Sequence, residues 1–155
     1  MMKKTKITKI SVALALSILL MISLVTSHSA MADMLFEAGS DEFYDGRELI
    51  ARVVECTAPD ASYAARLAIA CVIVNRVRDV RFPSDLYSVV YQRGEFACVS
   101  TDRFASVEPS YLSRVAARDA LLGFDISSGA VYFRQGYPSE RHGCCFYHDG
   151  FLFYK

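Results

Sequence analysis

The sequence predicts one small α+β domain, with about four helices followed by a small antiparallel sheet. Apolar residues recur at helical spacing through the middle of the 155-residue chain, and the pattern becomes strand-like after Gly129. An Asp-Gly pair near the end, between two aromatic-rich runs, is typical of a hairpin turn. Helices followed by strands, with no internal repeat and no low-complexity stretch, indicate a single domain of this class.

Residues 1–32 have the features of a secretory signal peptide. Four lysines within the first nine residues precede an apolar stretch at 10–25, and residues 30–32 read Ala-Met-Ala. This stretch is shorter than the ~20 residues that a membrane-spanning helix needs, so we expect cleavage after Ala32, with an uncleaved anchor as the alternative. Residues 33–46 are expected to form a lead-in segment and residues 47–155 the domain. In either case we expect the rest of the chain to work outside the cytoplasm.

The charge of the chain without its leader argues against a nucleic-acid partner. Four of the 17 Lys and Arg residues lie in the leader, which leaves 13 against 17 Asp and Glu, a net charge of −4. No basic block remains, so we expect no nucleic-acid binding. We expect a monomer, and contact with a membrane only through an uncleaved leader.

The cysteines do not form a metal-binding pattern. There are five, Cys56, Cys71, Cys98, Cys144 and Cys145, so at least one stays unpaired within the chain. No Cys-x-x-Cys or His-x-x-x-His spacing occurs, and we therefore predict no metal site and no cofactor. Cys71 lies inside an apolar run and is predicted to be a small core residue.

Three helices are predicted between residues 47 and 91. The first runs from Arg47 to about Cys56 and ends before a Pro-Asp pair. The second runs from Tyr63 to Arg78, and between Leu67 and Val74 it is apolar on every side, so we expect it to be buried almost all round. A shorter third helix runs from Pro83 to Tyr91.

A loop, a fourth helix and a small sheet complete the predicted domain. Residues 93–107 read as a loop, and Pro109 and Gly123 bracket the fourth helix. Residues 130–133 read as a strand, and 145–147 and 151–154 as a hairpin around His148, Asp149 and Gly150.

Several stretches of the sequence match the motifs of one known protein family. The opening helix of that family is matched by residues 49–55, and its Ala- and Val-rich helix ending in Asn-Arg-Val by residues 68–77. Arg-Phe-Pro follows at 81–83, Val-Val-Tyr-Gln at 89–92, and Gly-Glu-Phe at 94–96 stands where the family has Gly-Gln-Phe. The tail also fits at 129–133 and 150–154. By these motifs the chain resembles the SleB-type cell wall hydrolases over about residues 47–155. The block from Asn-Arg-Val to Gln is the most specific part of the resemblance.

The resemblance implies a lysozyme-like fold and an activity on the glycan strands of peptidoglycan. In such enzymes a glutamic acid in a groove protonates the glycosidic oxygen between muramic acid and glucosamine. A lytic transglycosylase needs no second carboxylate, because the muramoyl 6-hydroxyl attacks in place of water. Apolar walls should raise the pKa of the acid so that it holds a proton at neutral pH.

The position of the family's acid is occupied here by a residue that is not an acid. That acid stands eighteen residues before the Asn of Asn-Arg-Val, and counting back from Asn75 gives Thr57. Glu55 lies two residues earlier, about 200° round the helix axis, so it faces away unless the turn is remodelled. Glu55 is the first candidate catalytic acid, with an exposed carboxylate at a helix end as the alternative.

Glu95 is the second candidate catalytic acid, because it stands at the family's Gln position in a loop expected to line the groove. The alternative is that Glu95 is a solvated charge on that loop. The family's histidine near the C-terminus is replaced by Phe151. His148, three residues earlier, is a candidate for substrate binding, with an ordinary surface residue as the alternative.

Aromatic residues supply the remaining candidates for substrate binding. Phe96, Tyr91 and Tyr132 are expected either to stack on sugar rings or to fill the core. Asn75 and Arg76 are expected to pin the end of their helix to the following loop. The predicted function is a secreted peptidoglycan glycan-strand hydrolase or lytic transglycosylase. The alternative is a catalytically degenerate protein of the same fold that binds glycan strands without cutting them.

Overall fold

The computed structural model describes residues 40–137 and 146–155. The predicted signal peptide therefore lies outside the described residues. Among those that are described, no helix is long and apolar enough to cross a membrane.

The first described helix, α2, spans Asp41–Thr57 and begins six residues before the predicted start. Ser40 caps it, because its Oγ accepts a hydrogen bond from the amide of Phe43 at 3.1 Å. Two acidic residues in the first turn, Asp41 and Glu42, add favourable interactions with the helix dipole. Residues 41–46 of the predicted lead-in segment are therefore helical.

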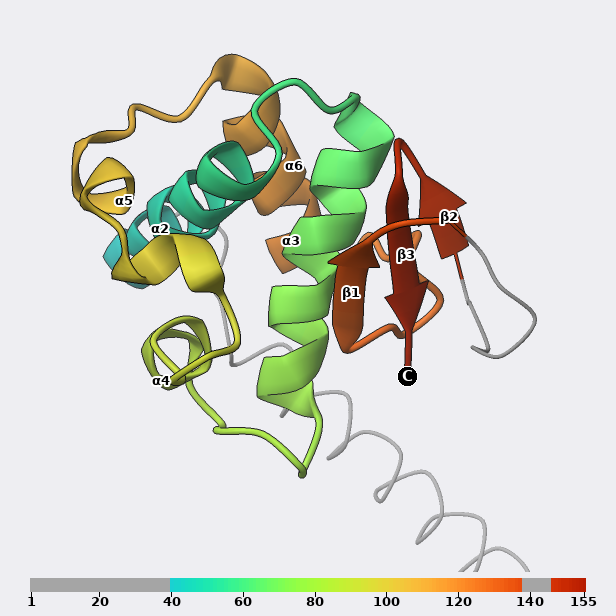
Figure 1. The fold of residues 1–155 in the computed structure, drawn as a ribbon. Coiled ribbons are helices and arrows are strands. Elements are labelled where there is room, and N and C mark those ends of the chain that lie inside the picture. The colour runs from blue at the N-terminus through green and yellow to red at the C-terminus, as the bar shows by residue number, and fades with distance from the viewer. Residues whose placement is uncertain (1–39, 138–145) are drawn as a thin grey trace, which may run out of the picture. The chain divides into compact units, whose positions relative to one another are not determined.

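Helix α3, Tyr63–Arg78, has the predicted bounds and forms the centre of the domain. Every residue from Ala65 to Val74 is buried, as the apolar run at 67–74 predicted. Figure 1 shows α3 between helices α2 and α6 on one side and the sheet on the other. A helix with neighbours on both sides can be apolar around its whole circumference, and each fully buried Ile or Val adds about 1.5–3 kcal/mol of transfer free energy.

The segment after α3 contains more helix than predicted. Helix α4, Leu86–Val90, falls within the predicted third helix. The predicted loop at 93–107 contains a 3-10 helix, Ala97–Ser100, and a short helix, α5, at Asp102–Ser106. Helix α6, Tyr111–Leu121, lies between Pro109 and Gly123, the predicted limits of the fourth helix. It packs against both α2 and α3.

Three antiparallel strands form the sheet, in the order β1-β3-β2. They are β1, Tyr132–Gln135, β2, Phe146–His148, and β3, Phe151–Tyr154. Asp149 and Gly150 make the predicted hairpin turn, and their φ angles of 47° and 78° are those that a tight two-residue turn requires. The predicted class, α+β with a small C-terminal antiparallel sheet, is confirmed.

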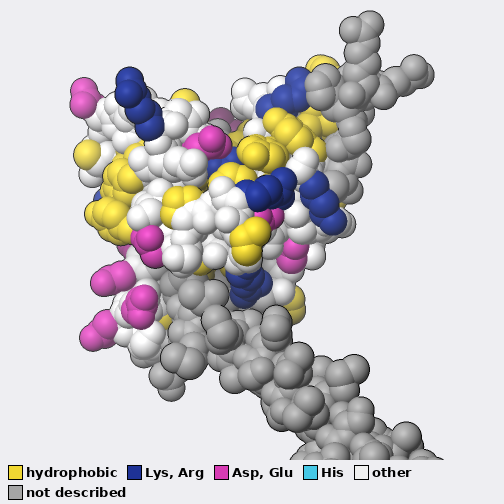
Figure 2. Space-filling view, turned by 90° about the horizontal axis from the view of Figure 1, so that it is seen from below, with side chains coloured by type: hydrophobic (Ala, Val, Ile, Leu, Met, Phe, Trp, Pro, Cys, Tyr) yellow, Lys and Arg dark blue, Asp and Glu magenta, His cyan; other side chains and the backbone are white. Residues whose placement is uncertain are grey.

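Charged side chains of both signs occur on the molecular face in Figure 2, where they alternate with apolar areas. On this face the Arg and Lys side chains do not merge into one continuous basic surface.

Candidate functional site

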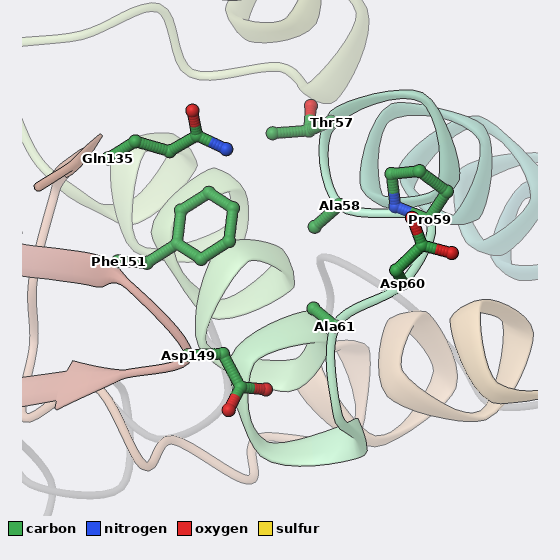
Figure 3. A pocket seen from close by; sticks show the side chains of 8 residues that line it. All are labelled: Thr57, Ala58, Pro59, Asp60, Ala61, Gln135, Asp149 and Phe151. Carbon is green, nitrogen blue, oxygen red and sulfur yellow. The ribbon is translucent and has the colours of Figure 1, made fainter.

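A pocket of about 240 Å³ opens where α2 ends and the sheet begins. One wall is the end of α2 and the turn after it, and the other is formed by β1 and the β2–β3 hairpin (Figure 3). The lining residues are Thr57, Ala58, Pro59, Asp60, Ala61, Gln135, Asp149 and Phe151. Two segments that are far apart in the sequence, 57–61 and 149–151, thus face one another across this pocket.

Thr57 and Phe151 stand at the two positions where the resemblance predicts the family's acid and histidine. Both line the same pocket, although 94 positions separate them in the sequence. Neither side chain ionises near neutral pH, so neither can serve as a general acid or base. Both positions that the resemblance predicts to be catalytic therefore line this pocket, and neither has an ionisable side chain.

The remaining polar groups of the pocket are Asp60, Gln135 and Asp149. Asp149 Oδ2 accepts a hydrogen bond from the amide of Ser62 at 2.7 Å, and hydrogen bonding from Ser62 lowers the pKa of Asp149. Asp60 and Gln135 are exposed at the rim. These groups offer acceptors and an amide donor to a polyhydroxylated ligand, and Phe151 offers an apolar surface.

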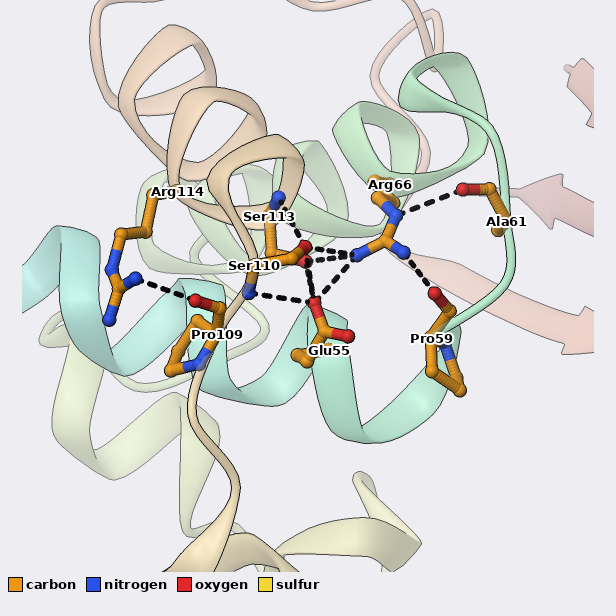
Figure 4. Close-up of polar contacts among 8 residues, drawn as sticks. All are labelled: Glu55, Pro59, Ala61, Arg66, Pro109, Ser110, Ser113 and Arg114. Carbon is orange, nitrogen blue, oxygen red and sulfur yellow. Dashed lines mark hydrogen bonds and ion pairs between the residues drawn. The ribbon is translucent and has the colours of Figure 1, made fainter.

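Glu55 points away from this pocket, toward α6. Its Oε2 accepts hydrogen bonds from the amide of Ser110 at 3.0 Å, from Ser110 Oγ at 2.6 Å and from Ser113 Oγ at 2.8 Å (Figure 4). Arg66 on α3 completes the set, with Nη1 at 2.7 Å from the same oxygen. The side chains of Glu55 and Arg66 are only 13% and 5% exposed. This cluster ties α2, α3 and α6 together.

The environment of Glu55 stabilises its ionised form. Burial alone would raise its pKa, but the hydrogen bonds from Ser110, Ser113 and Arg66 outweigh burial and lower the pKa to about 2. A carboxyl group with this pKa carries no proton at neutral pH. The alternative of an exposed helix-end carboxylate is therefore wrong for Glu55, because its side chain is only 13% exposed and is paired with Arg66.

Glu95 forms an ion pair with Arg76, whose Nη2 lies 2.8 Å from Glu95 Oε2. The guanidinium of Arg76 also lies against the rings of Phe82, Phe96 and Tyr132, with its central carbon 4.8, 5.1 and 5.3 Å from their centroids. The Glu95 side chain is 31% exposed. Glu95 is therefore partly exposed, as the alternative of a solvated loop charge expects, but it also forms an ion pair with the buried Arg76. This ion pair lies outside the Thr57 pocket.

Asn75 and Arg76 fix the end of α3, and their side-chain hydrogen bonds reach beyond the loop that directly follows. Asn75 Nδ2 donates to the carbonyl oxygen of Ala130 at 3.0 Å, and Arg76 Nε donates to that of Val131 at 2.6 Å. Both contacts lead to the segment before β1. The two residues hold the helix end, as predicted: Arg76 packs on Phe82 in the loop that follows α3, and the hydrogen bonds add the segment before β1.

The predicted aromatic binding residues have different surroundings. Phe96 is buried beneath Arg76 and beside Phe133, so the expectation that it stacks on sugar is corrected to a core role. Tyr91 is exposed and stacks on Tyr87, with centroids 4.7 Å apart. Tyr132 is half-buried and stacks on Tyr154, with centroids 5.5 Å apart.

His148 is half-buried at the end of β2, where it stacks on Phe146 and lies 3.6 Å from Asp149 Oδ1. It borders the turn that carries the pocket residue Asp149, but it does not line the pocket itself. In residues 40–137 and 146–155, no three His, Cys, Asp or Glu side chains are grouped so that they could hold a metal ion.

The family profile described as Cell Wall Hydrolase matches residues 60–148. The chain belongs to the cell wall hydrolase family. Spore cortex-lytic enzymes of Oceanobacillus iheyensis and Halalkalibacterium halodurans are 33% and 34% identical to it over 86 residues. These matches cover 56% of this chain, but only 31% and 26% of the two relatives. The chain thus matches about a third or less of the length of these curated relatives.

Two solved structures share the fold of this cell wall hydrolase family member. The catalytic domain of the Bacillus cereus SleB protein matches with a TM-score of 0.64 and 24% identity, over 72% of this chain and 91% of that one. The catalytic domain of the germination-specific lytic transglycosylase SleB from Bacillus anthracis matches with a TM-score of 0.65 and 22% identity, over 77% and 100%. The predicted lysozyme-like fold class is confirmed.

Sequence reasoning missed Gln135 and Asp149 as pocket residues, and Ser110 and Ser113 as partners of Glu55. The Asp-Gly turn next to the family's histidine position was the available signal for Asp149. Nothing in the local sequence marks the two serines, because they reach Glu55 only through the packing of α6 on α2.

Proposed function

We propose that this protein acts on the glycan strands of peptidoglycan and that it binds them in the pocket beside Thr57. Membership of the cell wall hydrolase family supports a peptidoglycan-degrading function. The pocket supports the location, because it contains both positions at which the family resemblance expects catalytic side chains, Thr57 and Phe151. Its carboxylates, its amide and its aromatic ring suit the hydroxyls and the apolar faces of sugar rings.

The first candidate function is cleavage of the glycan strand by a secreted hydrolase or lytic transglycosylase. Either reaction needs a proton donor at the glycosidic oxygen, and Glu55 and Glu95 are the glutamates proposed for this role. In the described conformation both carboxylates are ion-paired, Glu55 with Arg66 and Glu95 with Arg76. Cleavage by either glutamate therefore requires that its ion pair open when the glycan binds.

The second candidate function is binding of glycan strands without cleavage. One observation favours it over the first: Thr57 and Phe151 line the pocket, and these are the residues at which the resemblance predicts the family's acid and histidine. An ordinary general acid contributes about 10²–10⁴-fold to the rate, so its absence would leave binding with little cleavage. The geometry supports this second candidate best.

The test is to incubate the purified protein with isolated peptidoglycan, then measure bound protein by sedimentation and released fragments by mass spectrometry. We expect binding with no fragments above the background of a protein-free sample. Fragment release that disappears in a folded Glu55→Gln or Glu95→Gln variant would instead establish cleavage and identify its acid. Absence of both binding and release would contradict the proposed function as a whole.

A further inference from the structure

The thiol of Cys98 lies directly over the last turn of α2, next to the pocket. Cys98 belongs to the 3-10 helix Ala97–Ser100. Its Sγ lies 3.4 Å from Thr57 Oγ1 and 3.9 Å from the carbonyl oxygen of Val53. The 3-10 helix and the end of α2 are therefore in contact through this sulfur.

Cys56 occupies the same part of α2. It lies three residues after Val53 and immediately before Thr57, and residues three and four apart in a helix share one face. Burial raises the pKa of the Cys98 thiol, and an interaction with the Cys56 thiol adds to that increase. Because Cys98 Sγ contacts both Val53 and Thr57, it lies beside the turn of α2 that carries Cys56. Both cysteines are only half-buried, so a small reagent can reach them.

We propose that Cys56 and Cys98 form a disulfide bond when the folded protein meets a small-molecule disulfide, as it would outside the cytoplasm. One cysteine thiolate attacks a sulfur of the small disulfide, and one small thiol leaves. The second cysteine thiolate then attacks the protein sulfur of the mixed disulfide and releases the second small thiol. Each protein thiol loses one proton, and the two electrons reduce the small disulfide.

This bond joins the end of α2 to the 3-10 helix at the edge of the Thr57 pocket. It closes a loop between residues 42 positions apart in the sequence, which restricts the unfolded chain much more than the folded one. The bond therefore stabilises the folded domain and fixes the position of the segment that contacts Thr57. The proposal does not depend on whether the protein binds or cuts glycan.

The test uses the purified full chain, equilibrated with either glutathione disulfide or dithiothreitol, then alkylated and digested with trypsin. Cleavage after arginine places Cys56 in peptide 53–66, Cys98 in 94–103, Cys71 in 67–76, and Cys144 and Cys145 together in 142–155. We expect oxidation to join peptides 53–66 and 94–103 with the loss of two hydrogens. We also expect it to raise the melting temperature by about 10 °C.

Cys71 provides an internal control, because it is buried and its thiol donates to the carbonyl oxygen of Phe124 at 3.1 Å. Burial raises the pKa of Cys71 to about 12, so it should stay unlinked. The Cys98→Ser variant should lose both the linked peptide and the shift in melting temperature. Recovery of peptides 53–66 and 94–103 as separate alkylated species after oxidation would overturn the proposal. Linkage of either peptide to 142–155 would also overturn it.

Discussion

Glu55 is held in its ionised form by two serines and by the guanidinium of Arg66, all within 3.0 Å of one carboxylate oxygen. Its pKa of about 2 lies below the ordinary value of 4.5, so the unfolded chain binds its proton more readily than the folded one does. The stabilisation from Glu55 is therefore complete above about pH 4.5. It is lost as the pH falls from there toward 2.

Glu55→Gln should lower the free energy of unfolding by about 3 kcal/mol at pH 7, because it leaves the buried Arg66 without its counter-charge. At pH 3 the difference in the free energy of unfolding between the parent and the variant should be smaller by about 2 kcal/mol. At that pH the parent has already lost much of the stabilisation that ionised Glu55 provides. Urea unfolding at the two pH values measures both quantities.

Glu108→Gln is the matched control for this measurement. Glu108 also pairs with an arginine, Arg114, but its side chain is 81% exposed, and exposed pairs contribute about 0–1 kcal/mol. An equal effect of the two substitutions would show that the buried cluster around Glu55 does not have the stabilising role assigned to it.

Among the secondary-structure elements, α3 was predicted to the residue, whereas the segment at 93–107 was not. The apolar run in α3 is long and is bounded by a Pro-Asp turn and by arginines, so local sequence determines both of its ends. The 3-10 helix and α5 are only 4 and 5 residues long. Such short helices are stabilised by packing against α2, which no local pattern records.

In the candidate site too, local sequence motifs located some residues, whereas others come together only through the packing of the helices. Thr57 and Phe151 were recognised in the sequence because family motifs set their positions. The partners of Glu55 could not be predicted, because Arg66, Ser110 and Ser113 come from two other helices. Only the packing of those helices on α2 brings the four side chains together.

Ile69→Asp should unfold the domain. Ile69 is fully buried in α3, and an unpaired carboxylate there should cost several kcal/mol, a large part of the roughly 5–15 kcal/mol that stabilises a domain. Val80→Asp, at a fully exposed position just beyond the same helix, should melt like the parent. A soluble Ile69→Asp variant with a cooperative parent-like melt, measured by circular dichroism, would contradict the central place given to α3.

At the scale of the whole molecule, export is the prediction that determines where the protein works. The lysine-rich start, the apolar stretch and the Ala-Met-Ala site predict cleavage after Ala32. N-terminal sequencing of the protein from culture medium or cell wall should begin at Asp33. Recovery of the intact leader in the membrane fraction would favour the anchored alternative.

The most direct test of the account is the rate at which Thr57→Glu releases soluble fragments from purified peptidoglycan, compared with the parent. The central claim is that the Thr57 pocket binds glycan and lacks its general acid. Restoring a carboxyl group at position 57 should therefore raise fragment release by about 10²-fold or more. Thr57→Gln, which has the size of glutamate but no transferable proton, should behave like the parent. A parent that releases fragments as fast as Thr57→Glu would contradict the claim.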